Sequence, residues 1–401
     1  MKILILAKQC PYPLDDGASI AIHMLSKGLV AAGATVDLLA FNTTKHTYDG
    51  DLDISELSHY NSIQLIPLDN RPSVIGAALN MMTKESYHVS RYRSSEMERR
   101  LSTILPEQSY DFVQIESSHL LIYYVLISRY HSGKIVLRAH NVEHQIWRRY
   151  QAQLENSIFS KYHHIQANRL HDIEEQYAAK LDGILTVSEV DRAYFFKLNQ
   201  RSFTIPIGLD MPSAGDQLGK TSSPTFGFIG SMDWSPNIEG LRWLFDKVIA
   251  RADSAFRMVL AGRNFEAAKL TIPSQRNIKI LGEIEDVSEF WNQVDVLMVP
   301  LFSGSGTRVK IIEAFTHQKL VLTTSIGIEG IPANDGEHAV IRDQEDDWAR
   351  AIDQIRDDWP AYNTLQRNAR KLAEKHYEYR QVGKTAMEIY QQLTSTDPNQ
   401  V

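Results

Sequence analysis

A glycine-bearing loop that leads into a helix carries two cations, and this segment has the residue types best suited to chemistry. It runs from Leu301 to Phe315 as LFSGSGTRVKIIEAF, after a predicted strand that ends at Val299. We predict that the helix begins near Thr307, where free backbone N–H groups and a partial positive charge suit phosphate. The helix dipole disfavours Arg308 and Lys310 in a first turn, so a bound anion would explain why both are there.

Glu313 lies about one and a half turns into the same helix, and its carboxylate could accept hydrogen bonds from sugar hydroxyls. The alternative is a packed loop, with Arg308 and Lys310 in solvent and Glu313 in a salt bridge. The loop is not a P-loop, because Gly-Lys-Ser/Thr is missing. No G-x-G-x-x-G sequence follows the first strand of either half, which excludes a nicotinamide fingerprint.

Two positions in the first half of the chain also follow predicted strands. Gly17 lies in a loop of two prolines and two aspartates at the start of a helix, where a glycine lets the backbone approach phosphate or sugar closely. His140 follows the strand 135–138, and a neutral imidazole there could hydrogen-bond to a sugar hydroxyl. The alternatives are an ordinary strand-to-helix turn for Gly17 and a helix cap for His140.

Two segments, 87–93 and 147–150, interleave cations with aromatic residues. Such a face could meet anionic lipid headgroups or the diphosphate of a lipid-linked acceptor. The alternative is a solvated helix face. The pair His140 and His144 has the spacing of metal ligands, but neither a Glu after the first His nor a third ligand accompanies it, so no metal site is expected.

The composition of the 401-residue chain, 43% hydrophobic and 23% charged, is that of a soluble globular protein. Its net charge of -7 disfavours nucleic acid as a partner. The single cysteine, Cys10, allows no intrachain disulfide and indicates a reducing compartment. No apolar stretch approaches the roughly 20 residues that cross a bilayer, and the short apolar run at the N-terminus is not typical of a signal peptide. We therefore expect a cytoplasmic protein, with peripheral contact on the cytoplasmic membrane face as an option.

Both halves of the sequence alternate between strands and helices, which predicts two doubly wound α/β domains of similar size with a cleft between them. The predicted strands are 2–7, 35–40, 62–66, 112–115, 135–138, 183–187, 203–205, 225–229, 256–261, 277–281, 294–299 and 320–323. A stretch rich in Gly, Pro and Ser from 206 to 224 reads as a linker. We predict an N-terminal domain over 1–205 and a C-terminal domain over 206–376, with a final helical segment, 377–401, that packs back on the first domain.

The chain resembles retaining glycosyltransferases of the GT-B fold, the group called family 4, over nearly its whole length. The residues 226–237, FGFIGSMDWSPN, are similar to the opening of the donor domain in the branch with Asp-Trp-x-Pro-Asn. The run 304–314, GSGTRVKIIEA, is similar to that branch's nucleotide-sugar loop. Weaker matches are Val187-Ser188, 205–210 and 260–262. The loop with Gly17 resembles the family's glycine loop, and His140 resembles a histidine that contacts the donor sugar.

Two departures from the family pattern stand out. Many members have two glutamates seven residues apart in the nucleotide-sugar loop, but here the first position is Ser305 and only Glu313 remains. Many also have an Arg and a Lys soon after the first strand of the donor domain, where this chain has Ser231 and Asp233. We therefore expect Arg308 and Lys310 to stabilise the diphosphate.

The resemblance implies a retaining glycosyltransferase that takes a sugar from a nucleotide-diphosphate sugar, with no metal or other cofactor required. The acceptor would be a glycan, a lipid-linked molecule or another hydroxyl compound in surface polysaccharide or glycoconjugate biosynthesis. The catalytic candidates are His140, Arg308 and Lys310. The donor-binding candidates are Gly17, Ser231, Gly304, Ser305, Gly306, Thr307, Arg308, Lys310 and Glu313. Two alternatives remain open: a sugar-nucleotide epimerase of the same fold, and a non-catalytic sugar-binding partner of another transferase.

Overall fold

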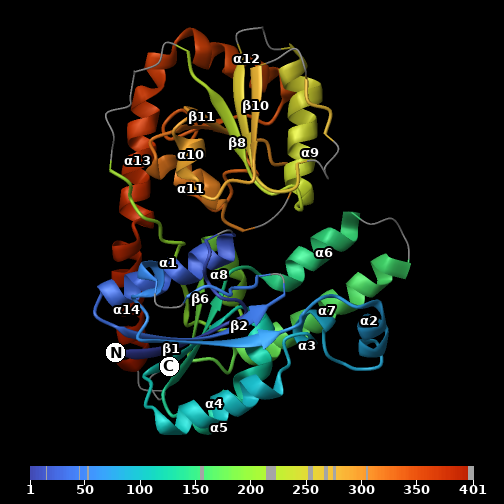
Figure 1. The fold of residues 1–401 in the computed structure, drawn as a ribbon, viewed down its shortest axis with the longest axis vertical. Helices are drawn as coiled ribbons and strands as arrows, with labels where there is room; N and C mark the ends of the chain where they lie inside the picture. Colours follow the sequence, from blue (N-terminus) through green and yellow to red (C-terminus); the bar gives the residue numbers. More distant parts are fainter. Residues whose placement is uncertain are drawn as a thin grey trace. The chain divides into compact units, whose positions relative to one another are not determined.

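The computed structural model describes residues 1–14, 16–44, 46–51, 54–153, 158–213, 223–251, 256–265, 270–273, 277–303 and 306–395. The chain divides into two compact units (Figure 1). Unit 1 comprises Met1–Gly208 and Tyr379–Val401, and unit 2 comprises Leu209–Glu378. The chain therefore passes from one unit to the other twice, after Gly208 and after Glu378.

Unit 1 is built on a seven-stranded parallel sheet with the order β3-β2-β1-β4-β5-β6-β7. Its strands are β1 (Lys2–Ala7), β2 (Thr35–Thr43), β3 (Ser62–Leu68), β4 (Phe112–Glu116), β5 (Lys134–Ala139), β6 (Gly183–Thr186) and β7 (Ser202–Thr204). Its helices are α1 (Gly17–Ala31), α2 (Val74–Asn80), α3 (Tyr87–Ser90), α4 (Ser95–Glu107), α5 (Tyr124–Tyr130), α6 (Glu143–Gln153), α7 (Ile158–Ala178), α8 (Glu189–Phe195) and α14 (Tyr379–Ser395). Every strand predicted for this part of the chain is present.

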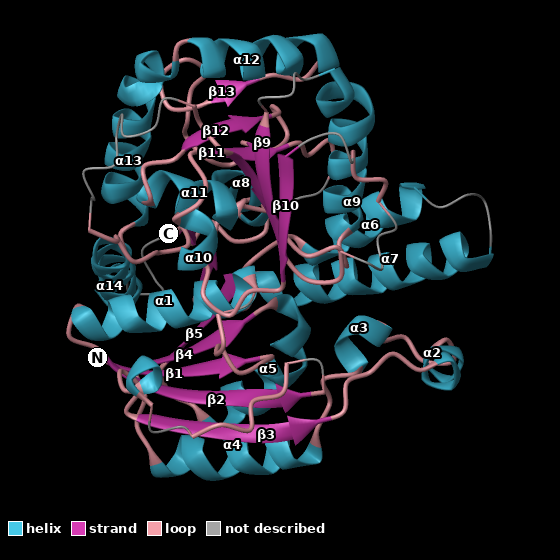
Figure 2. Ribbon diagram, turned by 45° about the horizontal axis from the view of Figure 1, so that its top comes forward, coloured by secondary structure: helices cyan, strands magenta, loops and turns pink. Residues whose placement is uncertain are grey.

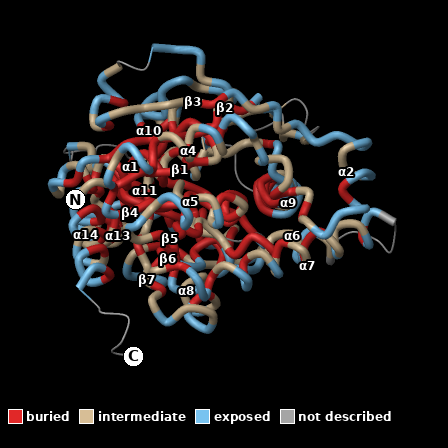
Figure 3. The backbone as a smooth tube through the Cα atoms, turned by 90° about the horizontal axis from the view of Figure 1, so that it is seen from below, coloured by how far each residue is buried: buried red, intermediate tan, exposed pale blue. Residues whose placement is uncertain are grey.

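Both faces of the unit 1 sheet are buried, as the continuous apolar runs of its strands indicate. Along β1, Leu4 and Leu6 pack in a cluster that includes α4 and α5. Ile3 and Ile5 point to the other face, into a cluster that includes α1 and α14. Figure 2 shows α1 and α4 on opposite faces of the sheet, and Figure 3 shows β1, β4 and β5 in the buried interior.

The two helices α1 and α14 approach each other closely because a glycine lies on each at the contact. A Cβ on Gly383 would overlap the carbonyl oxygen of Gly28, and a Cβ on Gly28 would overlap that of Tyr379. The apolar side chains Val382, Ala386 and Tyr390 of α14 then reach the sheet in the same cluster as α1. The last helix is therefore part of the unit 1 core.

Unit 2 is built on a six-stranded parallel sheet with the order β10-β9-β8-β11-β12-β13. Its strands are β8 (Phe226–Ile229), β9 (Arg257–Ala261), β10 (Asn277–Gly282), β11 (Val296–Val299), β12 (Leu320–Thr323) and β13 (Val340–Ile341). Its α-helices are α9 (Ser235–Trp243), α10 (Ser288–Trp291), α11 (Val309–Thr316), α12 (Glu345–Asp357) and α13 (Asn363–Tyr377).

Two features of unit 2 differ from the prediction. The strand β13 was missed, because two residues are too short a run to show a pattern. The sequence of 236–250, with Pro236 at a tolerated first-turn position, predicts one helix. The structure breaks it: α9 ends at Trp243, a π-helical turn spans Leu244–Val248, and a 3-10 turn spans Ile249–Arg251. The apolar positions of all three pieces still face the core of unit 2.

The strand order reverses once in each sheet, between β1 and β4 in unit 1 and between β8 and β11 in unit 2. At such a reversal the connections leave in opposite directions, and ligands bind beyond the carboxyl ends of the strands. The topology alone therefore indicates that a ligand site lies at the edge of each sheet where the strands have their carboxyl ends.

We predict that Gly383→Ala destabilises the protein, although Gly→Ala inside a helix usually stabilises by about 0.5–1 kcal/mol. Here the added methyl group must push α14 away from α1, and overpacking of this kind costs about 1–3 kcal/mol. Hydrogen exchange should show the loss of protection in unit 1. The control is Lys384→Ala, at an exposed position of the same helix, and a Gly383→Ala variant at least as stable as the parent would contradict the close approach.

Candidate functional site

The sheet of unit 2 opens at its switch point. β8 and β11 pair only at Phe226 with Val296 and at Gly227 with Leu297, and beyond these residues each strand pairs only with its outer neighbour. The carboxyl ends of β8 and β11 are thus not held together by ladder hydrogen bonds, and the loops that follow them flank the opening.

The floor of this opening is made of glycines because there is no room for side chains. Gly230 follows β8, and a Cβ on it would lie 2.7 Å from the ammonium nitrogen of Lys310 and 2.7 Å from the amide nitrogen of Asn237. Gly262 follows β9 with a φ of 137°, and a Cβ on it would overlap the carbonyl oxygen of Gly230. A side chain at either position would displace the groups that line the opening.

Lys310 extends from α11 into the space above Gly230. Its ammonium nitrogen donates to Asn237 Oδ1 at 3.2 Å and lies 4.7 Å from the centre of the Phe228 ring. Burial, together with the charge of Arg308, lowers the pKa of Lys310 to about 7, although Glu313 acts in the opposite direction. A cation held in this way gains from any anion that comes near it.

Arg308 is the N-cap residue of α11, so the helix begins at Val309 and not near Thr307 as expected. The Arg308 guanidinium is buried, donates to the carbonyl oxygen of Gly306 and lies 5.9 Å from the centre of the Trp234 ring. The hydroxyl of Thr307 is buried and has no hydrogen-bond partner among the described residues. The candidates Gly304 and Ser305 lie outside the described residues.

Glu313 is partly buried one turn further along α11. Burial raises the pKa of Glu313 to about 7, although Lys310 opposes this. No ion pair within 4 Å joins Glu313 to Lys310 in the described part of the chain, so the salt-bridge alternative for Glu313 finds no support there. Its carboxyl group is available to a ligand.

Ser231 belongs to a small hydrogen-bonded turn between β8 and α9. Its hydroxyl donates to Asp233 Oδ2 at 3.0 Å, and its carbonyl oxygen accepts from Asn237 Nδ2 at 2.8 Å. Asn264, which follows β9, donates to both carboxylate oxygens of Asp233. Asn237 thus links the Ser231 turn to Lys310. Asn237 is the last residue of the motif 226–237, but we did not predict this role from the sequence.

In unit 1, Gly17 is the first residue of α1, and this helix start already has an anionic cap. Asp16 is the N-cap residue, and its Oδ1 accepts from the backbone N–H of Ser19 at 2.7 Å. Gln9 Nε2 donates to the same carboxylate, and His46 Nε2 lies 3.5 Å from Asp16 Oδ2. A ligand phosphate at Gly17 would meet the charge of Asp16, so the structure favours a role for Gly17 in backbone contact over one in charge stabilisation.

His140 follows β5, at the edge of the unit 1 sheet that the topology selects. Its Nε2 lies 2.6 Å from Glu116 Oε2, at the carboxyl end of β4. Burial lowers the pKa of His140, although the hydrogen bond to Glu116 raises it. His140 is therefore paired with a carboxylate and does not cap α6, which begins at Glu143.

Further ionisable groups surround His140 that we did not single out from the sequence. Burial raises the pKa of Glu143 to about 7, with Lys8 opposing and Glu174 reinforcing the shift. Burial alone would lower the pKa of Lys8, but the attraction of Glu143 and other groups raises it above the ordinary value. Lys8 directly follows β1 and Glu116 ends β4, so this cluster flanks the switch point of unit 1. The sequence did contain a signal for this cluster, because Lys8 and Glu116 are charged residues that directly follow the predicted strands 2–7 and 112–115.

The two segments that interleave cations with aromatic residues contact each other through one stacked pair of rings. His88 is buried and stacks on Trp147 with ring centroids 3.8 Å apart. Arg93 pairs with Glu85, and Arg91 Nη1 donates to the carbonyl oxygen of Asn70 at 2.8 Å. Most of the polar groups named here have partners within the protein, which leaves less of this face for lipid headgroups than we expected.

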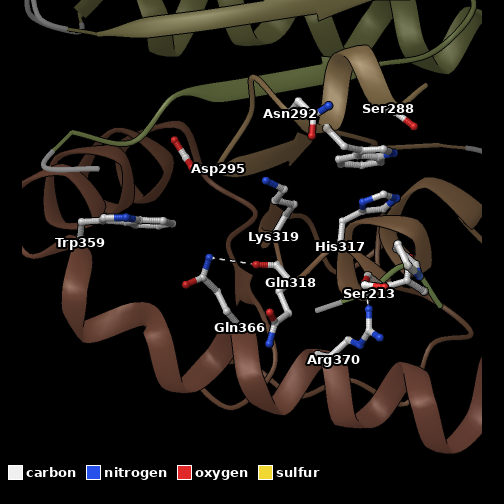
Figure 4. Close-up of a pocket in the computed structure, with 13 residues that line it drawn as sticks. Ser213, Ser288, Asn292, Asp295, His317, Gln318, Lys319, Trp359, Gln366 and Arg370 are labelled. Atoms are coloured by element: carbon white, nitrogen blue, oxygen red, sulfur yellow. Dashed lines mark hydrogen bonds between the residues drawn. The ribbon is translucent and has the colours of Figure 1, made fainter. Parts of the chain in front are cut away.

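A cavity of about 330 Å³ in unit 2 lies at the opposite edge of the sheet (Figure 4). Asp295 and Lys319 line it, and they directly precede β11 and β12. The cavity therefore lies at the amino ends of the strands, away from Gly230 and Lys310, and it is not the site selected by the topology. In Figure 4 the amide of Gln366 donates to the carbonyl oxygen of Gln318.

Two kinds of feature are absent from the described residues. No three His, Cys, Asp or Glu side chains there come together as they would to hold a metal ion. The same residues include no helix with the length and apolar character that a membrane span requires.

The part of the chain that contains the unit 2 site is similar to a known family of domains. Residues 223–358 match the family model described as Glycosyl transferases group 1, and this match includes Gly230, Asn237, Arg308, Lys310 and Glu313. Over 401 residues the chain is 24% identical to a Klebsiella pneumoniae protein described as an uncharacterized 44.6 kDa protein in the cps region. That alignment covers 95% of this chain and 97% of the relative.

Solved structures have a similar fold. The Anabaena protein Alr3699/HepE in complex with UDP-glucose is 16% identical with a TM-score of 0.66, over 99% of this chain and 100% of that one. Sucrose-phosphate synthase (tll1590) from Thermosynechococcus elongatus is 16% identical with a TM-score of 0.71, over the same shares. The protein has the GT-B fold of these glycosyltransferase structures, as expected.

We predict that the Lys310 amine titrates near pH 7 in the unliganded protein. Arg308→Gln should raise its pKa because a like charge is removed, and Glu313→Gln should lower it because an opposite charge is removed. NMR titration of protein whose lysines carry ¹³C-methyl groups measures the midpoint, with Lys310→Arg to assign the signal. A midpoint near the ordinary lysine value of about 10.4 would show that the ammonium is solvated and would contradict this description of the site.

Proposed function

We propose that this protein is a retaining glycosyltransferase that moves a sugar from a nucleotide-diphosphate sugar to a hydroxyl group of an acceptor. One observation carries the proposal: Arg308 and Lys310 come together with a glycine floor at the switch point of unit 2. The match of residues 223–358 to the Glycosyl transferases group 1 model and the UDP-glucose bound to HepE support this assignment.

The diphosphate is assigned to the cations of unit 2. As the bond between the anomeric carbon and the phosphate oxygen breaks, negative charge grows on the leaving diphosphate, and fixed cations lower the energy of that state. Lys310 suits this task because its ammonium is more stable beside an anion than in the empty site. Gly304, Ser305, Gly306 and Thr307 would add backbone and hydroxyl donors at the start of α11, and Ser231 would add a hydroxyl group after β8.

Glu313 is assigned to hydroxyl groups of the donor. A carboxylate can accept two hydrogen bonds from vicinal hydroxyls, and among the described residues Glu313 has no ion-pair partner that it would have to give up. Binding of these hydroxyls would favour its ionised form, which burial disfavours in the empty site. Both Lys310 and Glu313 would thus be fully charged with the donor bound.

The acceptor and part of the donor sugar are assigned to unit 1, through His140 and the backbone at Gly17. In the proposed reaction the acceptor oxygen bonds to the anomeric carbon on the face that the diphosphate leaves. The acceptor proton passes to the leaving phosphate oxygen, so that no separate base and no metal ion are required. This scheme retains the configuration at the anomeric carbon.

The relative in the cps region favours surface polysaccharide or glycoconjugate biosynthesis, with a glycan or lipid-linked acceptor. The single buried cysteine favours a cytoplasmic location. The protein would contact the cytoplasmic face of the membrane peripherally only if its acceptor is lipid-linked.

We predict that Arg308→Ala and Lys310→Ala each weaken binding of UDP by about 10- to 100-fold, since a charge-assisted hydrogen bond contributes about 1.5–3 kcal/mol. Titration calorimetry measures the dissociation constants, after a thermal-shift screen of nucleoside diphosphates has identified the base. The control is Arg251→Ala, a unit 2 arginine whose partners Glu345 and Asp346 lie in the same unit. If both variants bound UDP as tightly as the parent does, the assignment of the diphosphate to this site would be wrong.

We also predict that the product keeps the anomeric configuration of the donor. The ¹H coupling constant at the anomeric position of the product distinguishes the two outcomes directly. An inverted product would exclude attack on the leaving-group face. Consumption of the donor to a rearranged or hydrolysed sugar, with no dependence on any acceptor, would favour the epimerase alternative.

A further inference from the structure

A chain of buried polar groups runs through unit 1 from the last helix to His140. The hydroxyl of Tyr390 in α14 donates to Gln114 Oε1 in β4. Gln114 Nε2 donates to Glu116 Oε1, and the second carboxylate oxygen, Oε2, lies 2.6 Å from His140 Nε2. Tyr390, Gln114 and Glu116 are all at most 1% exposed, so water does not compete for these bonds.

The surroundings of Glu116 define its charge. The side chain of Arg138 in β5 is completely buried, and its Nε lies 3.9 Å from Glu116 Oε2. The Arg138 guanidinium nitrogens have no hydrogen-bond partner among the described residues, which leaves the Glu116 carboxylate as its counter-charge. Glu116 is therefore a carboxylate, which can only accept hydrogen bonds.

The direction of the hydrogen bonds then defines the state of the imidazole. Since Glu116 accepts, the proton of the bond to His140 must lie on Nε2. In a neutral imidazole the other nitrogen, Nδ1, then carries a lone pair. The His140 side chain keeps 11% of its surface exposed, and among the described residues only Glu116 bonds to a ring nitrogen.

We propose that Glu116, held by Gln114 and Tyr390, is a positioning residue that keeps His140 in the Nε2–H tautomer, so that Nδ1 accepts a hydrogen bond from a sugar hydroxyl. This inference rests on the proposed function for the identity of the ligand, but the tautomer itself does not depend on it. The C-terminal helix thereby acts on the site through Tyr390, without contact with the ligand.

The alternative state is distinct in its chemistry. With the proton on Nδ1, His140 would offer a donor to the ligand and would place two lone pairs, on Nε2 and on Glu116 Oε2, against each other. An amide at position 116 removes that conflict: Gln114 Nε2 still donates to its oxygen, so its NH₂ group faces His140 Nε2 and donates to it. Glu116→Gln should therefore favour the Nδ1–H tautomer.

The test is the tautomeric state of His140, measured by ¹⁵N NMR of the imidazole in protein labelled at histidine, with His140→Gln to assign the signals. We expect mainly Nε2–H in the parent and a shift toward Nδ1–H in Glu116→Gln. Tyr390→Phe removes one hydroxyl and leaves the ring stacked on Phe112, at a centroid distance of 4.6 Å. It should shift the ratio in the same direction even if Glu116→Gln does not fold.

The matched control is Tyr110→Phe, a buried tyrosine of unit 1 whose hydroxyl donates to Asp37 at 2.9 Å and takes no part in the chain to His140. It should leave the tautomer unchanged. In turnover of UDP-glucose, or of the nucleotide sugar that the screen identifies, Glu116→Gln should lower kcat by about 10-fold or more, within the range for misplacement of a group at the site. The dissociation constant for UDP should stay at the parent value.

An Nδ1–H or doubly protonated His140 in the parent at pH 7.5 would overturn the proposal, as would a Glu116→Gln spectrum equal to that of the parent. If no nucleotide sugar bound to the protein, that result would count against the proposed function. The conclusion about the His140 tautomer would still hold, because it does not depend on the ligand. A parent-like kcat in both Glu116→Gln and Tyr390→Phe, with the tautomer shifted, would overturn the positioning role alone.

Discussion

A parallel sheet has two apolar faces, and each must be covered. In unit 1 this constraint determines the course of the whole chain. The helix α1 covers part of one face, and α14, which comes after all of unit 2 in the sequence, covers more of it. The glycines at positions 28 and 383 let the two helices approach until their backbones touch. Removal of α14 would leave Phe112 and its neighbours on that face exposed.

Burial of the sheet also explains why the polar residues inside it are functional candidates. A buried polar group is costly unless it is hydrogen-bonded, and a buried charge unless it is paired. Gln114, Glu116 and Arg138 lie on adjacent strands of a core that could have been apolar throughout. The hydrogen bonds of Gln114 and Glu116 end at His140, whose side chain keeps 11% of its surface exposed, so the series leads from the interior to the edge of the sheet.

The sequence predicted the strands well because each is a short apolar run between turn signals, and the pattern failed only for β13, whose two residues show none. It indicated Arg308, Lys310 and Glu313 as candidate site residues because they lie within one loop and one helix. It missed Asn237 and Glu116 because their partners are distant: Asn237 bonds to Lys310 73 residues away, and Glu116 meets His140 only through the register of β4 and β5. Local patterns reveal elements and loop motifs, whereas pairs between elements need the strand order.

The division of unit 1 into two segments has a consequence for synthesis on the ribosome. Unit 2 is continuous from Leu209 to Glu378 and can complete its core as soon as these residues emerge. The 1–208 segment emerges first but lacks α14, so one face of its sheet stays partly uncovered while unit 2 is made. Domains generally fold in the order in which they are synthesised, and partly covered sheets are prone to aggregation. Here the first segment to leave the ribosome is the last to be finished, and the cell must keep it soluble for the time that translation of some 170 further residues takes, at about 5–20 residues per second.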